Sequence, residues 1–60
     1  MAEFEITKDA RGEFRWRLKS NNGQIIATSG EGYTTKDSAK NGIAAVQRDA
    51  PGAKIDDLTD

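Results

Sequence analysis

Residues 13–19 alternate between charged and large apolar side chains, a period of two that a β-strand distributes over its two faces. The apolar positions are Phe14, Trp16 and Leu18. Residues 3–7 alternate in the same way, with Phe4 and Ile6 as the apolar positions. The sequence therefore predicts two half-buried strands, at residues 3–7 and 13–19, whose apolar faces share one core.

The connection between these strands runs from Lys8 to Gly12 and contains a turn-forming aspartate and a glycine able to adopt positive φ. Closing a five-residue loop here predicts an antiparallel pairing of the two strands. The facing pairs are then Ile6 with Phe14, Phe4 with Trp16, Glu5 with Arg15, and Glu3 with Arg17. Because opposite charges face each other on the exposed side, the charge pattern favours the same arrangement as the apolar pattern.

A third strand is expected at residues 24–29, after the turn signal Asn21-Asn22-Gly23. A two-residue turn at Asn22-Gly23 directs Ile25 and Ala27 toward the core. A three-residue loop that ends at Gly23 directs Ile26 and Thr28 there instead. The sequence leaves both alternatives open, and in each of them one isoleucine lies on the face opposite the core.

A helix is expected over residues 35–50, with Thr34 or Thr35 as the N-cap and Asp37 in the first turn. Four residues at helical spacing form its apolar face: Ala39, Gly42, Ile43 and Val46. A glycine within this face indicates close approach to Trp16 or Phe14, because glycine lowers helix propensity. Pro51 and Gly52 end the helix.

Composition limits how such a small unit is stabilised. The 60 residues include no cysteine and no histidine, which excludes disulfides and the common zinc sites, and we expect no metal and no cofactor. Domains this short rarely form a sufficient core alone, which leaves self-association as the remaining means of stabilisation.

The nine basic and ten acidic residues nearly balance, which argues against the broad positive electrostatic field that attracts nucleic acid. Without a long apolar run or a secretory leader, a cytoplasmic protein is expected.

The chain resembles the YegP-like family of small uncharacterised proteins. The resemblance covers residues 4–51 and is carried by Phe14-Arg15-Trp16-Arg17-Leu18-Lys19, Asn22-Gly23, Ile25-Ile26-Ala27, Ser29-Gly30-Glu31-Gly32-Tyr33 and Asn41-Gly42-Ile43. It implies an α+β unit of β-β-β-α-β order that occurs once or as a tandem pair and exchanges its C-terminal strand. From the residues alone, 53–58 is either a frayed tail or a short fourth strand. The resemblance implies the strand, exchanged between two copies of a homodimer. Ile55 and Leu58 are the candidate interface residues.

Enzymatic activity is not expected, and no residue is assigned a catalytic role. General acid–base and covalent catalysis rely most often on histidine, cysteine or an activated serine. A set of Ser29, Tyr33 and Lys36 near the start of the helix is better explained as a turn and a helix cap. The segment Gly30-Glu31-Gly32 lacks the spacing of a phosphate loop, and its glutamate would repel an anion.

The leading functional hypothesis is a noncatalytic homodimeric module that binds a partner. The candidate partner-binding residues are basic: Arg15, Arg17 and Lys19 on the open sheet face, and Lys36 and Lys40 on the helix. The alternative is weak nucleic-acid binding, because residues 30–36 with Ala39-Lys40 and Ala44-Ala45 resemble the closing segment of double-stranded RNA-binding domains. That family has a preceding helix which this sequence does not show, and the acidic pI adds to the disagreement.

Overall fold

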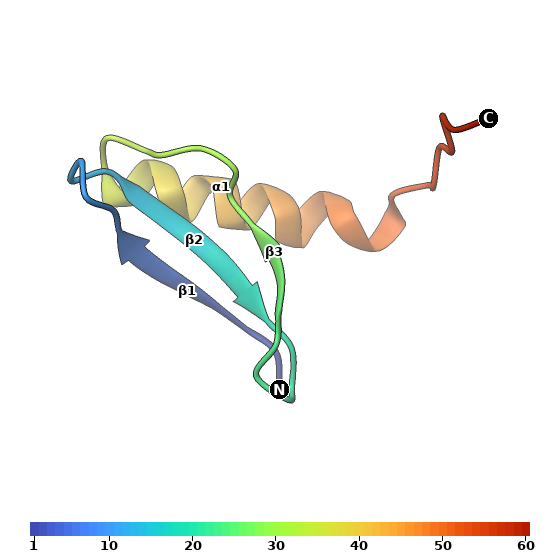
Figure 1. Ribbon diagram of the computed structural model, residues 1–60, viewed down its shortest axis with the longest axis horizontal. Coiled ribbons are helices and arrows are strands. Elements are labelled where there is room, and N and C mark those ends of the chain that lie inside the picture. The colour runs from blue at the N-terminus through green and yellow to red at the C-terminus, as the bar shows by residue number, and fades with distance from the viewer.

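A computed structural model describes all 60 residues as a three-stranded antiparallel sheet with one helix on one of its faces (Figure 1). The elements are β1 (Glu3–Lys8), β2 (Phe14–Lys19), β3 (Ile25–Thr28), α1 (Lys36–Asp49) and the short 3₁₀ helix η1 (Ala50–Gly52). Strand β2 is central, between β1 and β3. The C-terminal half of α1 extends beyond the sheet, and the chain end leads away from it (Figure 1).

Both hairpins close across three-residue loops of the same kind. In the first, the Asp9 N–H donates to the Glu13 carbonyl at 2.9 Å, and the Gly12 N–H donates to the Asp9 carbonyl at 3.0 Å. Gly12 ends this loop with φ of 81°. The second loop repeats the pattern with Ser20, Gln24 and Gly23, at 2.8 and 3.0 Å, and the φ of Gly23 is 87°. Each loop therefore ends at a residue whose backbone conformation favours glycine.

The β1–β2 pairing is displaced by two residues from the pairing that the sequence predicts. The pairs are Phe4 with Leu18, Ile6 with Trp16, Glu5 with Arg17, and Glu3 with Lys19. The prediction is wrong because Asp9 and Glu13 themselves pair, which shortens the loop to Ala10–Gly12. A displacement of two residues keeps each side chain on its predicted face, so the apolar face is retained.

Neither of the two arrangements predicted for β3 is fully correct. The loop ends at Gly23, but the pairing of β2 with β3 shifts between Leu18 and Lys19, so that Lys19 faces Ile25 and Leu18 faces Ala27. Ile26 is the extra residue of this β-bulge. Ala27 thus lies on the core face, whereas Ile25 and Ile26 remain 54% and 59% exposed.

The core lies between β2 and α1. Trp16 and Ala39 are its buried residues, and Phe4 contacts Trp16 edge to face with ring centroids 5.4 Å apart. Thr35 is the N-cap of α1, and its Oγ1 accepts a hydrogen bond from the Ser38 N–H at 3.1 Å. Ile43 and Val46 are half-buried on the same helical face as Ala39. The apolar stripe predicted for the helix therefore covers the predicted face of the sheet.

No fourth strand follows the helix. After η1, the chain from Ala53 to Asp60 is irregular, and every residue in it is exposed. The fold of the single chain is thus β-β-β-α, and the C-terminal strand implied by the family resemblance is not formed in it. Ile55 and Leu58 pack against nothing within their own chain, with 94% and 87% of their surface exposed.

Candidate interaction surfaces

The basic row on the open sheet face is paired with carboxylates. Arg15 Nε lies 2.8 Å from Asp9 Oδ2, and Arg17 Nε lies 2.7 Å from Glu5 Oε1. Lys19 Nζ lies 3.7 Å from the second oxygen of Glu5. Strand pairing produces this arrangement, because Glu5 faces Arg17 directly across the ladder. The face therefore presents ion pairs in place of three free cations.

The same ion pairs lower the pKa values of two carboxyl groups. The hydrogen bond from Arg17, followed by the charge of Lys19, lowers the pKa of Glu5. The hydrogen bond from Arg15 lowers the pKa of Asp9, and the backbone N–H groups of Glu13 and Arg11 lower it further. Asp9 thus stabilises the first hairpin loop in addition to neutralising Arg15. Sequence reasoning identified Asp9 only as a turn former.

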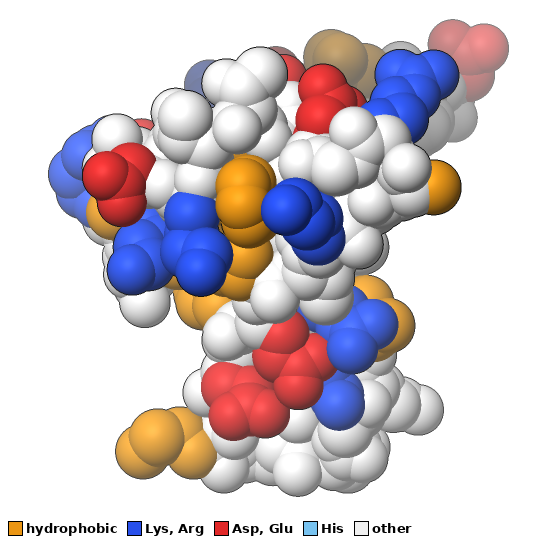
Figure 2. Space-filling model, turned by 90° about the vertical axis from the view of Figure 1, so that its left-hand side faces the viewer, with side chains coloured by type: hydrophobic (Ala, Val, Ile, Leu, Met, Phe, Trp, Pro, Cys, Tyr) orange, Lys and Arg blue, Asp and Glu red, His pale blue; other side chains and the backbone are white.

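The helix lysines differ from the sheet cations. Neither Lys36 nor Lys40 has a carboxylate within 4.0 Å. Lys36 Nζ lies 5.9 Å from the centroid of the Phe14 ring, and Lys8 Nζ lies 5.2 Å from the same centroid. Figure 2 shows this end of the molecule, where Lys and Arg side chains gather around a small hydrophobic patch. Acidic side chains are present on the same face, so the positive charge there is limited (Figure 2).

The residues considered for catalysis each contact a different neighbour. Ser29 Oγ donates to the Glu31 carbonyl at 2.8 Å, and Lys36 lies over Phe14. The Tyr33 hydroxyl lies against α1 at Gly42. No hydrogen bond joins these three side chains. Ser29 belongs to a turn before the capped helix, as expected, whereas the contact of Tyr33 with the helix was not predicted.

A side chain of the same protein fills the space beside the glycine-rich turn at residues 30–32. A Cβ atom built on Gly32 would collide with the carboxylate of Glu13. The space beside this glycine therefore holds a negatively charged side chain, which opposes an anion in addition to Glu31.

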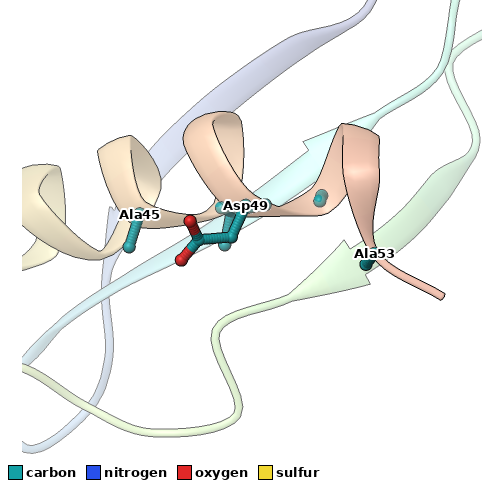
Figure 3. A pocket seen from close by; sticks show the side chains of 5 residues that line it. Ala45, Asp49 and Ala53 are labelled. Atoms are coloured by element: carbon teal, nitrogen blue, oxygen red, sulfur yellow. The ribbon is translucent and has the colours of Figure 1, made fainter.

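A shallow apolar hollow of about 310 Å³ lies along the C-terminal end of α1 and η1 (Figure 3). Its lining consists of Ala45, Val46, Asp49, Ala50 and Ala53. The hollow exists because α1 extends beyond the sheet and because its side chains there are small (Figures 1 and 3). Sequence reasoning missed it, since alanines near a helix end carry no distinctive pattern.

The tail begins at this hollow. Ala53 belongs to the lining, and Ile55 follows two residues later. Within the tail, Asp57 accepts a hydrogen bond from the Thr59 N–H at 2.9 Å, and the hydrogen bonds from Thr59 lower the pKa of Asp57. An apolar hollow and two exposed apolar side chains therefore lie at the same end of the molecule.

Comparison with known proteins identifies the family. The profile of a domain of unknown function, DUF1508, matches residues 9–57. The chain belongs to the DUF1508 family. This DUF1508 chain is similar to a UPF0339 protein of Agrobacterium fabrum, which is 44% identical over 98% of this chain and 94% of its own length. The chain is also similar to the UPF0339 protein YegP of Yersinia pestis, at 45% identity over 85% of this chain.

The fold of this DUF1508 chain is similar to that of a solved structure. An NMR structure of a protein from Haloferax volcanii is 49% identical, covers 95% of both chains and superposes with a TM-score of 0.88. The YegP match covers 45% of that protein, so this chain spans about half its length. No helix of the present DUF1508 chain has the length and apolar character to span a membrane. The family description assigns no activity, and functional inference therefore depends on the surfaces described above.

Proposed function

We propose that the chain is a noncatalytic homodimeric module, in which Ile55 and Leu58 of each copy pack against the other copy. The observation that carries this proposal is the near-complete exposure of both side chains in a protein whose buried core is only Trp16 and Ala39. Fully burying a side chain of this size contributes about 1.5–3 kcal/mol. Association is therefore a source of stability that the single chain lacks.

The position of the hollow supports contact between two identical copies. A two-fold interface must be complementary to itself, so a projecting group and its receiving surface have to lie on one patch. Ile55 and the hollow meet this condition, because Ala53 lines the hollow at the start of the tail. Asp49, which lines the hollow, is paired with Arg48 of its own chain, so the apolar contact carries this proposal. In the proposed dimer, Ile55 of each copy enters the hollow of the other.

The test measures molar mass by size-exclusion chromatography with light scattering. We expect a dimer for the intact chain, and a monomer both for a chain ending at Gly52 and for the Ile55→Ser/Leu58→Ser variant. Ile26→Ser is the matched control, because it removes an exposed isoleucine from β3 and should leave the dimer intact. An intact chain that is monomeric at high micromolar concentration would refute the proposal.

Weak nucleic-acid binding through the start of α1 is the second proposal. It is supported by Lys36 and Lys40, which have no carboxylate partner, in contrast to Arg15, Arg17 and Lys19. Phosphate contacts by free lysines weaken as salt increases. Titration with duplex RNA at low and moderate salt should then shift the amide resonances of residues 36–40, and Lys36→Gln/Lys40→Gln should abolish the shifts. Absence of shifts at low salt would leave only the first proposal.

A further inference from the structure

The chain contains two Asn-Gly dipeptides that the fold places in opposite settings. Asn22-Gly23 lies in the exposed loop between β2 and β3. Asn41-Gly42 lies inside α1 (Lys36–Asp49). The two sites share the same local sequence chemistry, so a difference in reactivity between them reports the effect of structure.

Asn-Gly is the dipeptide in which an asparagine side chain is most open to attack by its own backbone. The backbone nitrogen of the glycine bonds to Cγ of the asparagine, the C–N bond of the side-chain amide breaks, and ammonia leaves. The product is a cyclic succinimide. Water then opens either of its two carbonyls and gives aspartate or isoaspartate. Glycine favours the first step because it has no side chain to hinder the approach.

We propose that Asn22 is a modification site at which the fold promotes deamidation, whereas Asn41 is protected. The amide oxygen of Asn22, Oδ1, accepts a hydrogen bond from the hydroxyl of Ser20 and another from the Gln24 N–H at 3.4 Å. Negative charge develops on this oxygen when the glycine nitrogen attacks Cγ. The Ser20 hydroxyl is already directed at this oxygen and lowers the free-energy barrier to ring closure, as a donor in an oxyanion hole does, whereas the longer Gln24 contact contributes little.

The surroundings of Gly23 permit the reaction. Its backbone N–H donates to the Ser20 carbonyl at 3.0 Å, and this bond must break before the nitrogen can attack. Because the turn is exposed, opening of this one loop is enough to free the N–H and admit hydroxide. No atom lies within 4 Å of the position of a Cβ on Gly23. The loop therefore has room for the change in backbone geometry that ring closure requires.

The second dipeptide, Asn41-Gly42, lacks both the exposed loop and the free space beside the glycine. Gly42 lies mid-helix, where its N–H belongs to the hydrogen-bond ladder of α1. Its Cα also lies against the side chains of Tyr33 and Trp16, whose nearest atoms are 2.5 and 3.3 Å from a Cβ position. Ring closure at Asn41 therefore requires local opening of the helix.

The product changes the β2–β3 hairpin. Conversion of Asn22 adds one negative charge, and isoaspartate inserts an extra methylene into the main chain of a three-residue loop. The loop then no longer matches the spacing that brings Ser20 opposite Gln24. We expect the modified chain to lose stability through this hairpin, while α1 stays unchanged.

Tryptic peptide mapping tests the proposal on the intact folded chain in mildly alkaline buffer. Residues 20–36 and 41–48 fall in different tryptic peptides, so the two sites are measured separately by mass spectrometry. Asn22 should convert about tenfold or more faster than Asn41, because Asn41 reacts only through local opening. Enzymatic methylation of isoaspartate should label the first peptide alone.

Two variants and one condition isolate the cause. Ser20→Ala keeps the Asn-Gly sequence but removes one donor, and it should slow conversion of Asn22 about two- to tenfold. Asn22→Gln should abolish the product in peptide 20–36. In concentrated urea the two sites should react at similar rates. Equal rates in the folded chain, or no slowing in a Ser20→Ala chain with native circular dichroism, would overturn the proposal.

Discussion

The hydroxyl oxygen of Tyr33 lies 2.5 Å from the point where a Cβ on Gly42 would stand. Trp16 Nε1 is 3.3 Å from the same point, and this buried N–H has no hydrogen-bond partner. Tyr33 is fixed in turn by two backbone hydrogen bonds to Phe14, both at 2.8 Å. One glycine thus lets the helix approach the central strand and the linker at once.

Replacing this glycine should destabilise the protein even though alanine is the better helix former. Gly42→Ala gains about 1 kcal/mol in helix propensity. The added methyl group overpacks the contact with Tyr33, which costs about 1–3 kcal/mol. We expect a net loss of about 1 kcal/mol in the free energy of unfolding, measured by urea denaturation.

The Tyr33→Phe background provides the control, because it removes the oxygen closest to the new methyl group. Gly42→Ala should be less destabilising there than in the natural chain. The same loss in both backgrounds would contradict the assigned role of the Tyr33 hydroxyl.

The helix cap gives a second prediction. Thr35→Ala removes the side-chain acceptor of the Ser38 N–H and should cost about 1 kcal/mol, or about 4–8 °C in Tm. Thr34→Ala is the matched control, since the neighbouring threonine is not the N-cap and should change Tm little. A larger decrease in Tm for Thr34→Ala than for Thr35→Ala would show that Thr35 is not the N-cap.

Stability should fall at acidic pH through Glu5. Its folded-state pKa is lowered below the ordinary value of 4.5, first by the hydrogen bond from Arg17. A lowered pKa means that the ionised form favours the folded state. The contribution is therefore complete above pH 4.5 and is lost as pH falls through the folded pKa. Urea midpoints measured across this range should decrease accordingly.

Glu5→Gln should flatten this pH profile and lower the midpoint at neutral pH. Some slope should remain, because the pKa values of Asp9 and Asp57 are also lowered. An unchanged profile in the variant would show that the Glu5–Arg17 pair does not contribute to stability in solution.

Trp16 provides a direct test of the core. It is the only tryptophan and is 7% exposed, so its fluorescence should be blue-shifted and poorly quenched by iodide. Unfolding in urea should restore quenching. Efficient quenching of the native protein would contradict the packing of α1 on β2.

Alternation and capping residues predicted the order of three strands and a helix, and also the burial of Trp16 beneath the helix. The β1–β2 register required information that pattern alone lacks. A displacement by two residues keeps every side chain on the same face of the sheet. Phe4 therefore has an apolar neighbour whether it faces Trp16 or Leu18. The hydrogen bonds of Asp9 around the loop decide between them.

The candidate surfaces were less predictable than the fold. The sequence indicates a row of Arg15, Arg17 and Lys19, but only three-dimensional pairing shows that carboxylates occupy it. The bulge at Ile26 follows from the β2–β3 ladder, for which the sequence offered two registers. The hollow beside Ala53 depends on how far α1 extends beyond the sheet, a property of packing that no single residue specifies.

The matching three-residue loops also bear on how the chain assembles. Each strand pairs with its neighbour along the sequence, so sheet formation closes only short stretches of chain. Proteins with mostly local pairings fold quickly. Docking of the helix, in contrast, brings Gly42 against Trp16 from a distant part of the sequence, so we expect the sheet to form first.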